Sequence, residues 1–205
     1  MNKDNLTNRT SFWTPTRLGI TAGVLILTVA IVTAVYRPNR SGGVLTIKNG
    51  GAMTAPRALS EKVREENLRL ISGPTKKFDD YKGKVLILDI WATWCGPCRQ
   101  EIPHLIEIAN NYRGQGVEVL GLTTEDPESD LDLVRGFAQQ FRINYDIGFA
   151  SRIVSSEIMQ GRNGIPQTLI LDRAGTVRKH FVGFHPQLSI PQMKSALEEV
   201  LAMNQ

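Results

Sequence analysis

Residues 85–110 of the chain read VLILDIWATWCGPCRQEIPHLIEIAN and contain both of its cysteines, Cys95 and Cys98. The first seven of these residues form an almost unbroken apolar run that is rich in strand-forming side chains. After the cysteines, apolar side chains recur at helical spacing: Ile102, Leu105, Ile106 and Ala109. The cysteine pair is therefore predicted to lie where a buried strand turns into the N-terminus of a helix.

A cysteine pair at this position is suited to redox chemistry. Unpaired backbone N–H groups and the positive end of the helix dipole favour a thiolate there, and the thiolate is the nucleophile of disulfide exchange. Cys95 is predicted to be the more exposed thiol and to attack a substrate disulfide, and Cys98 to resolve the mixed disulfide. Between them, Gly96 and Pro97 fit a tight turn into a helix, and both are predicted to contact the substrate. The alternatives are a structural disulfide or half of a metal site, but the chain has no further cysteine.

Two acidic residues near the cysteines are candidate catalytic residues. Asp89 interrupts the apolar strand, and a buried carboxylate is costly unless it is paired or has a task. We interpret it as a proton acceptor for Cys98, reached directly or through water, with a raised pKa. The alternative is a strand-end carboxylate bonded to a neighbour. Glu101 follows Cys98 by one helical turn and would oppose its thiolate by like charge, unless it is an ordinary exposed helix residue.

Two tryptophans precede the cysteine pair, and we predict a different role for each. Trp94 is predicted to cover the sulfur atoms on the substrate side, whereas Trp91 is assigned to the core.

Composition and charge restrict the other possibilities. A chain of 205 residues has room for one domain of ordinary size and a tail. An apolar content of 41% and a charged content of 21% are near the globular average, so a core forms without further cross-links. The net charge of +4 is too weak and too dispersed to indicate nucleic-acid binding.

The N-terminal part of the chain has the pattern of a membrane anchor. Residues 18–36 contain no charged side chain and are long enough to cross the hydrocarbon core of a bilayer. Small residues at 32–34 leave a cleaved signal peptide open as an alternative. We predict a short cytoplasmic tail at 1–17, the anchor at 18–36, a linker at 37–64 that is rich in glycine and polar residues, and one folded domain at 65–205.

The rest of the chain alternates predicted strands and helices. Besides residues 85–91, strands are expected at 116–124, 144–149, 167–172 and 177–182, and a small hairpin at 68–79. Helices are expected at 58–67, capped by Ser60, and after the cysteines, at 130–142, at 152–160 and from Ser189, which reads as part of a capping box. This order predicts an α/β sandwich with a mixed central sheet.

Residues 81–103 and 164–175 together resemble the membrane-tethered TlpA/ResA-like thiol-disulfide oxidoreductases of the thioredoxin superfamily, and the resemblance extends over roughly residues 65–204. It implies a thioredoxin-like sandwich in which Pro166 is a cis-proline facing the cysteine pair. It also implies that the backbone of Ile165 pairs with the extended chain of a substrate. An X-Pro bond in a turn is otherwise expected to be trans. The resemblance places Asp89 on the buried acid of thioredoxins and Glu101 on the acidic position with which ResA-like proteins tune their thiols.

The function implied is that of a disulfide reductase tethered by a single span to the cytoplasmic (inner) membrane, with its domain on the extracytoplasmic, periplasmic side. Its substrates would be protein disulfides, such as those of apocytochrome c or copper-site proteins. Electrons would come from a transmembrane donor of the DsbD type, because the outer compartment is oxidising. No cofactor is expected besides the redox-active disulfide, and the chain is expected to be a monomer.

Two other functions remain open at this point. One is a dithiol oxidant, which would move electrons in the opposite direction, from substrate thiols to its own disulfide. The other is a copper-binding metallocentre assembly factor that uses the two cysteines with His180 or His185. A peroxidase is disfavoured, because Trp91 stands where a Pro-x-x-x-Thr-x-x-Cys motif needs its proline.

Overall fold

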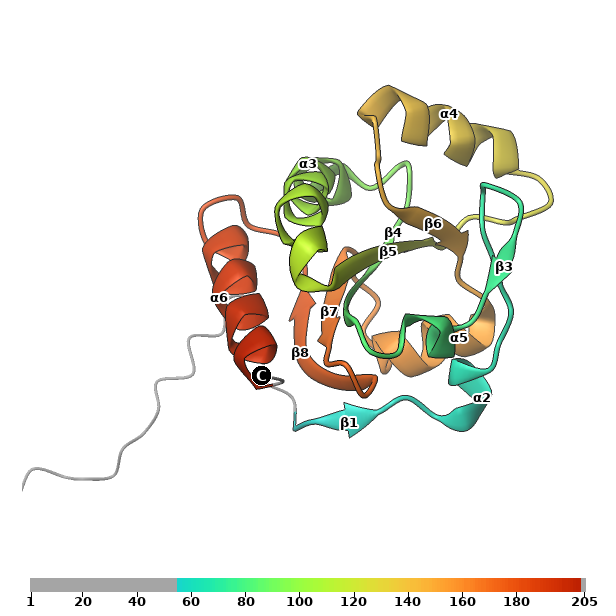
Figure 1. Cartoon of the computed structure of the whole chain (residues 1–205). Helices are drawn as coiled ribbons and strands as arrows, with labels where there is room; N and C mark the ends of the chain where they lie inside the picture. The colour runs from blue at the N-terminus through green and yellow to red at the C-terminus, as the bar shows by residue number, and fades with distance from the viewer. Residues whose placement is uncertain (1–54, 204–205) are drawn as a thin grey trace, which may run out of the picture. The chain divides into compact units, whose positions relative to one another are not determined.

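The computed structural model describes residues 55–203 and is built around one mixed sheet of six strands (Figure 1). The strands follow the order β1-β8-β7-β4-β5-β6. β4, β5 and β6 are parallel, whereas β7, β8 and β1 each run antiparallel to their neighbour. Their bounds are β1 Arg57–Ala58, β4 Val85–Trp91, β5 Val117–Thr123, β6 Asp146–Phe149, β7 Gln167–Leu171 and β8 Thr176–Val182. The predicted sandwich with a mixed sheet is confirmed.

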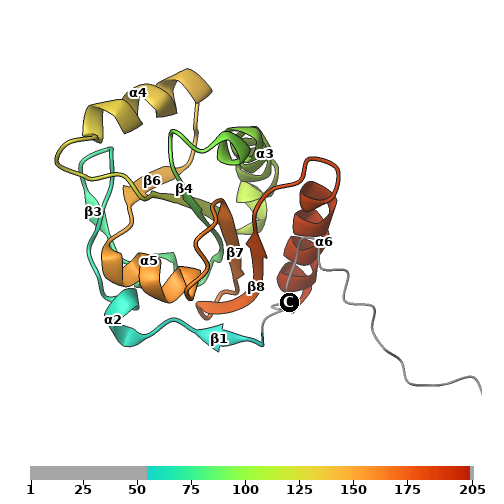
Figure 2. The ribbon, with the colours of Figure 1, turned by 180° about the vertical axis from the view of Figure 1, so that it is seen from behind.

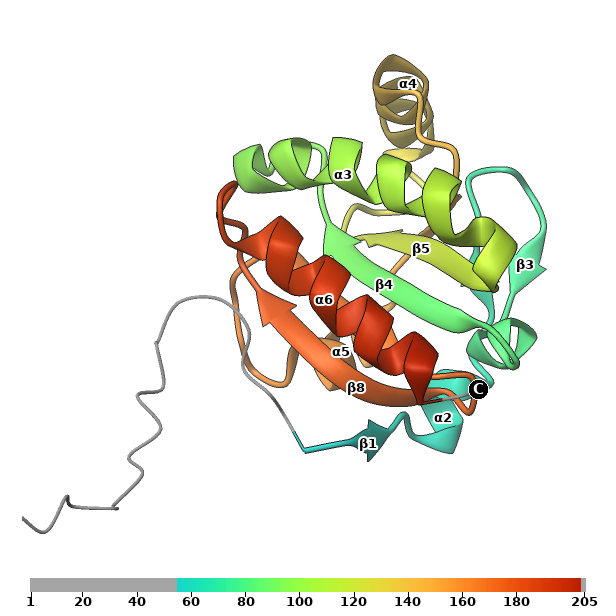
Figure 3. The same ribbon diagram turned by 60° about the vertical axis from the view of Figure 1, so that its left-hand side comes forward.

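Helices cover both faces of the sheet (Figures 2 and 3). One face packs against α3 (Gly96–Tyr112) and α6 (Ser189–Ala202). The other packs against α5 (Arg152–Met159) and the short α2 (Glu61–Arg64). α4 (Leu131–Phe141) packs near the start of α3, where its Phe137 ring lies 5.1 Å from the ring of Trp91.

Strand β4 lies in the middle of the sheet, and all seven of its residues are buried. Its side chains alternate between the two faces: Val85 and Ile87 contact the α3 and α6 layer, whereas Leu86 and Leu88 contact the α2 and α5 layer. A strand buried on both faces reads as a continuous apolar run, which is why its bounds agree with the predicted ones. The turn after β4 is therefore carried by a strand that is buried along its whole length.

The smaller elements complete the domain. β2 (Leu68–Arg69) and β3 (Thr75–Lys76) form the predicted hairpin, and two 3-10 turns follow at Phe78–Tyr81 and Arg113–Gln115. Ser60 caps α2 as predicted, accepting a hydrogen bond from the Val63 N–H at 3.3 Å. Ser189 does not cap α6. It is the first residue of that helix, and its hydroxyl oxygen accepts the His185 N–H instead.

The folded domain begins before the predicted boundary. Residues 57–64 were assigned to the linker, but β1 pairs with β8 and α2 buries Val63 completely. The reason is the apolar pair Leu59 and Val63, which contributes to the core under α5. The predicted tail at 1–17 and the predicted anchor at 18–36 lie outside the described residues. Within residues 55–203, no helix is long and apolar enough to span a bilayer.

Candidate active site

The two cysteines lie at the junction between β4 and α3, as predicted. Cys95 is the N-cap of α3, where its Sγ accepts the Cys98 N–H at 3.2 Å. The two sulfur atoms are joined in a disulfide, with the Cα atoms 5.3 Å apart. Cys95 is 4% exposed and Cys98 is fully buried. Only Cys95 therefore offers a sulfur atom to an incoming thiol or disulfide.

A second segment meets Cys95 from far along the chain. The Ile165–Pro166 peptide bond is cis, in agreement with the resemblance. The Ile165 carbonyl oxygen lies 3.7 Å from Cys95 Sγ, although the two residues are 70 positions apart in sequence. The backbone of Ile165 thus lies beside the reactive sulfur, where an extended substrate chain would have to pass.

The remaining residues predicted to contact a substrate are on the surface. Trp94 is 69% exposed, so its ring is available to a bound protein and does not pack into the core. Gly96 and Pro97 are also exposed, at the first turn of α3. Trp91 is fully buried, as predicted.

The two candidate carboxylates are both buried, one on the strand before the cysteines and one on the helix after them. Asp89 is 0% and Glu101 1% exposed, so the interpretation of Glu101 as an exposed helix residue is wrong. The Thr168 hydroxyl donates to Glu101 Oε1 at 2.6 Å, and Thr168 is paired with Asp89 across β4 and β7. Paired residues of neighbouring strands place their side chains on the same face, about 5 Å apart. The two acids therefore lie in one pocket of the core.

This burial changes the protonation of both acids. Burial raises the pKa of Asp89 well above its usual range, and the negative charge of Glu101 raises it further. Burial also raises the pKa of Glu101 to about 7, although the hydrogen bond from Thr168 acts in the opposite direction. Within the described residues, neither carboxylate oxygen of Asp89 has a hydrogen-bond partner. Asp89 is thus not a strand-end carboxylate bonded to a neighbour.

Two aromatic side chains close the space around Asp89. Gly121 is paired with Asp89 across β4 and β5. A Cβ atom at Gly121 would lie 2.9 Å from Trp91 Nε1 and 3.3 Å from the Tyr145 ring, so only glycine fits. Burial raises the pKa of the Tyr145 phenol, and the Asp89 and Glu101 charges add to that effect. The aromatic cover explains why the carboxylates are so strongly desolvated.

A buried carboxylate, whose role the sequence did not indicate, fixes the loop before Cys95 by hydrogen bonds. The Glu125 carboxylate is buried and accepts the Thr93 N–H at 2.7 Å, and it also accepts hydrogen bonds from the Thr93 and Thr123 hydroxyls. On the other side, Arg99 Nε donates to the Thr93 carbonyl at 2.8 Å. Both backbone groups of Thr93 are therefore fixed by side chains, two residues before the reactive cysteine.

The histidines considered as copper ligands are not arranged with the cysteines. Both ring nitrogens of His180 are engaged, one with Arg162 and the other with Gln167. Across residues 55–203, no group of three His, Cys, Asp or Glu side chains is placed to hold a metal ion.

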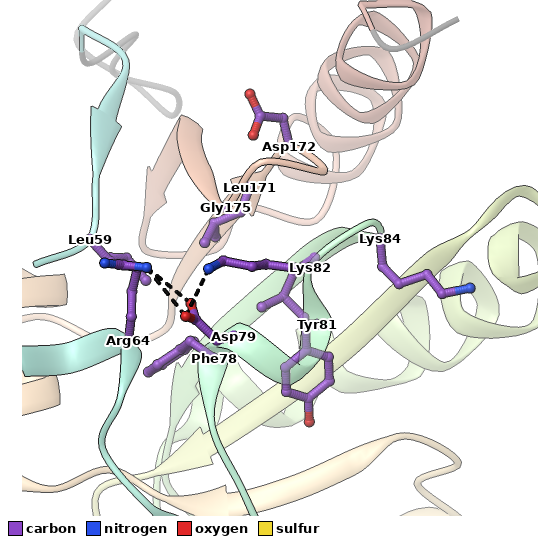
Figure 4. A pocket seen from close by; sticks show the side chains of 11 residues that line it. Leu59, Arg64, Phe78, Asp79, Tyr81, Lys82, Lys84, Leu171, Asp172 and Gly175 are labelled. Atoms are coloured by element: carbon purple, nitrogen blue, oxygen red, sulfur yellow. Dashed lines mark hydrogen bonds and ion pairs between the residues drawn. The ribbon is translucent and has the colours of Figure 1, made fainter. Parts of the chain in front are cut away.

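A shallow pocket lies at the other end of β4, away from Cys95 (Figure 4). Its floor is apolar and includes Leu59 and Phe78. At its rim, Asp79 lies between Arg64 at 3.3 Å and Lys82 at 2.8 Å. The Asp79 carboxylate is paired with both cations, and the pocket contains neither of the two cysteines, so we assign it no role in the chemistry.

The chain matches a family model and several characterised or solved proteins. Residues 60–180 match the model of the AhpC/TSA family. The thiol-disulfide oxidoreductase ResA of Geobacillus thermodenitrificans is 30% identical over 124 residues, which are 60% of this chain and 68% of that protein. The thioredoxin-like protein YneN of Bacillus subtilis is 34% identical over 119 residues, 57% of this chain and 67% of the relative.

A solved structure extends this similarity to the fold. The crystal structure of a putative thiol:disulfide interchange protein DsbE from Chlorobium tepidum superposes with a TM-score of 0.58 at 27% identity, and the match covers 66% of this chain and 92% of that one. These similarities agree with the cysteine pair at the start of α3 and with the cis-proline beside it. The chain belongs to the AhpC/TSA family and is a thiol-disulfide oxidoreductase of the ResA/TlpA-like kind, with a thioredoxin-like fold.

Proposed function

We propose that this oxidoreductase is a membrane-tethered reductase of protein disulfides outside the cytoplasm. The observation that carries the proposal is the position of Cys95 Sγ, between the Cys98 N–H at 3.2 Å and the Ile165 carbonyl at 3.7 Å. The N–H group and the α3 N-terminus stabilise a thiolate at this sulfur. The Ile165 backbone offers the edge along which a substrate chain pairs.

The reaction proceeds in two exchange steps. In the first, the Cys95 thiolate attacks one sulfur of a substrate disulfide, and the other substrate sulfur leaves as a thiolate that takes up a proton. In the second, Cys98 loses its proton and attacks Cys95 Sγ, which releases the second substrate thiolate. The substrate gains two electrons and two protons, and the chain is left with the Cys95–Cys98 disulfide seen in the structure.

The carboxylates beneath the cysteines govern the second step. Asp89 accepts the proton of Cys98 and later returns it, a role that its raised pKa favours. Glu101 lies one helical turn beyond Cys98, and its charge opposes a thiolate there. A strong dithiol oxidant is one whose reduced form is stabilised. Because the charge of Glu101 works against a thiolate at Cys98, it favours a reductant.

The proposed cellular setting rests on the sequence and on the chemistry. The apolar segment at 18–36 would tether the domain to the inner membrane, on its periplasmic side. Disulfides are favoured outside the cytoplasm, so net reduction there requires a transmembrane donor of the DsbD type. Apocytochrome c or copper-site proteins would be the substrates, the chain would act as a monomer, and the Cys95–Cys98 disulfide would be its only redox group.

The reduction potential tests the direction of electron flow. We expect the full-length chain in detergent micelles to equilibrate with thiol buffers at about −270 mV, the value typical of thioredoxin. Tryptophan fluorescence provides the signal, because Trp94 immediately precedes Cys95. A value of about −120 mV, as in DsbA, would assign the chain as an oxidant and would reject the proposed direction.

Removal of the Glu125 carboxylate should loosen the turn that presents Cys95. In Glu125→Ala the buried Thr93 N–H loses its acceptor, which is expected to lower the free energy of unfolding by roughly 1–3 kcal/mol. Glu125→Gln keeps one acceptor oxygen and should lose less. Urea unfolding of both variants gives the measurement, with Asp132→Asn as the control because the Asp132 side chain is 99% exposed. Equal losses in the alanine and glutamine variants would show that this hydrogen bond is not the cause.

A further inference from the structure

Two polar side chains are buried in the strands next to the cis-proline, where apolar residues would ordinarily lie. Gln167, the first residue of β7, is 0% exposed, and His180 on β8 is 1% exposed. Both are hydrogen-bonded to the segment that precedes Ile165. His180 Nδ1 lies 3.0 Å from Arg162 Nη1, and His180 Nε2 lies 2.9 Å from Gln167 Oε1. Gln167 Nε2 then donates to the Arg162 carbonyl at 3.0 Å and to the Gly164 carbonyl at 2.8 Å.

The donors and acceptors available fix the direction of every hydrogen bond in this network of three side chains. A guanidinium has only donors, so His180 Nδ1 must accept from Arg162. The proton of the neutral ring is then on Nε2, which donates to Gln167 Oε1. The amide nitrogen of Gln167 is left to donate to the two carbonyls. The network begins at the guanidinium of Arg162 and returns to the backbone carbonyl of Arg162, so it forms a closed ring of hydrogen bonds.

The charge state of the histidine is consistent with this arrangement. Burial lowers the pKa of His180 to about 4, and the positive charges of Arg162 and Arg57 add to the effect. The ring is therefore neutral at pH 7, and a single tautomer satisfies both of its neighbours.

The network of hydrogen bonds reaches Gly164, the residue before Ile165, whose backbone borders the reactive sulfur. Gln167 holds the Gly164 carbonyl on one side, and on the other the Gly183 N–H donates to the Pro166 carbonyl at 2.8 Å. The Ile165–Pro166 peptide is thus held between two fixed points. A rotation of the Gly164 carbonyl would turn the peptide that carries Ile165, and with it the edge beside Cys95.

We propose that Arg162, His180 and Gln167 are positioning residues that fix the Ile165 backbone in the orientation needed to pair with a substrate chain. This inference rests on the proposed function, in which the substrate pairs with Ile165. Burying an imidazole and an amide in a core costs free energy unless their hydrogen bonds are complete. Here the bonds are complete: one joins His180 to Gln167, and the other three reach Arg162 and Gly164.

Two disulfide substrates distinguish positioning from a general structural role. We would compare Gln167→Leu with the wild-type full-length chain in detergent micelles, using a disulfide-bonded peptide and the small aromatic disulfide DTNB, which has no peptide backbone. kcat/KM for the peptide should fall by about tenfold, because the variant loses the hydrogen bonds from Gln167 to the Arg162 and Gly164 carbonyls. The rate with DTNB should not change. Equal losses with both substrates, or no loss with the peptide, would overturn the positioning role.

Variants at the other two positions keep the test decisive if Gln167→Leu fails to fold. His180→Gln can keep the donor toward Gln167 but loses the acceptor for Arg162, whereas His180→Asn can keep that acceptor and loses the donor. His180→Gln should therefore retain more activity on the peptide than His180→Asn. Arg162 is only partly buried, and Arg162→Met should lower activity on the peptide selectively. Arg152→Met, which removes an exposed arginine at the start of α5, is the matched control.

The same assay separates failure of this inference from failure of the proposed function. A wild-type chain that leaves the peptide disulfide intact would reject the reductase proposal itself. A wild-type chain that reduces the peptide, together with Gln167→Leu and Arg162→Met chains that reduce it equally fast, would reject the positioning role alone.

Discussion

Replacement of Cys95 by serine should abolish disulfide reduction, with a loss on the order of 10³-fold or more. The reason is geometric as well as chemical. Cys98 is fully buried, so no second sulfur is available to begin the exchange when the Cys95 sulfur is missing. A serine hydroxyl at the same position is not an effective nucleophile near neutral pH. The measurement is the initial rate of reduction of a disulfide-bonded peptide by the full-length chain.

The companion variant Cys98→Ser separates attack from resolution. It retains Cys95 Sγ at the N-terminus of α3 and removes the thiol that resolves the mixed disulfide. The chain should then remain covalently linked to its substrate, and mass spectrometry under non-reducing conditions should locate the bond at Cys95. A stable adduct at Cys98 in the Cys95→Ser chain would reverse the two roles.

Replacement of either buried carboxylate by its amide should stabilise the chain at alkaline pH. The folded state holds the Glu101 proton up to about pH 7, whereas an exposed glutamate releases it near 4.5. Because the folded state binds more protons in this window, stability falls as the pH rises through it. The pKa difference corresponds to roughly 3 kcal/mol, which Glu101→Gln should recover at pH 8. Asp89→Asn should act in the same direction, since burial raises the pKa of Asp89 as well.

Urea unfolding at pH 5 and at pH 8 measures this effect in the oxidised chain. Through Asp89 and Glu101, the free energy of unfolding of the wild type should be larger at pH 5 than at pH 8. Each amide variant should make this change with pH smaller. The exposed Glu65 provides the control variant Glu65→Gln, which should leave the pH dependence unchanged. If both amide variants were as sensitive to pH as the wild type, the two acids would not be the cause.

This destabilisation is of the kind found at functional sites. An amide or an apolar side chain at position 89 would cost the fold less than a carboxylate does. Retaining two desolvated acids on the strand and the helix that carry the cysteine pair is consistent with their role in proton exchange, since stability is commonly lower where catalysis requires a strained or charged group.

The fold could be predicted from the sequence where local signals were strong. Strand β4 was predicted with its observed bounds, because a strand buried on both faces is apolar along its whole length. The helix after the cysteines followed from apolar residues at helical spacing. Asp89 was recognised because a charged residue in such a strand is conspicuous.

Other features depend on contacts between distant residues, and no local pattern indicates them. Glu125 looks like an ordinary loop acid until β5 places it beside Thr93, 32 residues earlier in the chain. His180 and Gln167 meet only because β7 and β8 are neighbouring strands. The burial of Glu101 likewise depends on Thr168, which lies 67 positions away. The strand β1 was missed because two residues carry too little periodicity to be read.

The unequal exposure of the two sulfurs has a kinetic consequence. Cys95 carries the one sulfur of the pair that is not fully buried, so it is the point of entry both for the protein substrate and for the molecule that returns the cysteine pair to its starting redox state. Both must dock on the same face, beside Trp94 and Ile165, and a complex with one excludes the other. The enzyme must therefore alternate between its two partners in a ping-pong cycle, in which each partner competitively inhibits the half-reaction of the other.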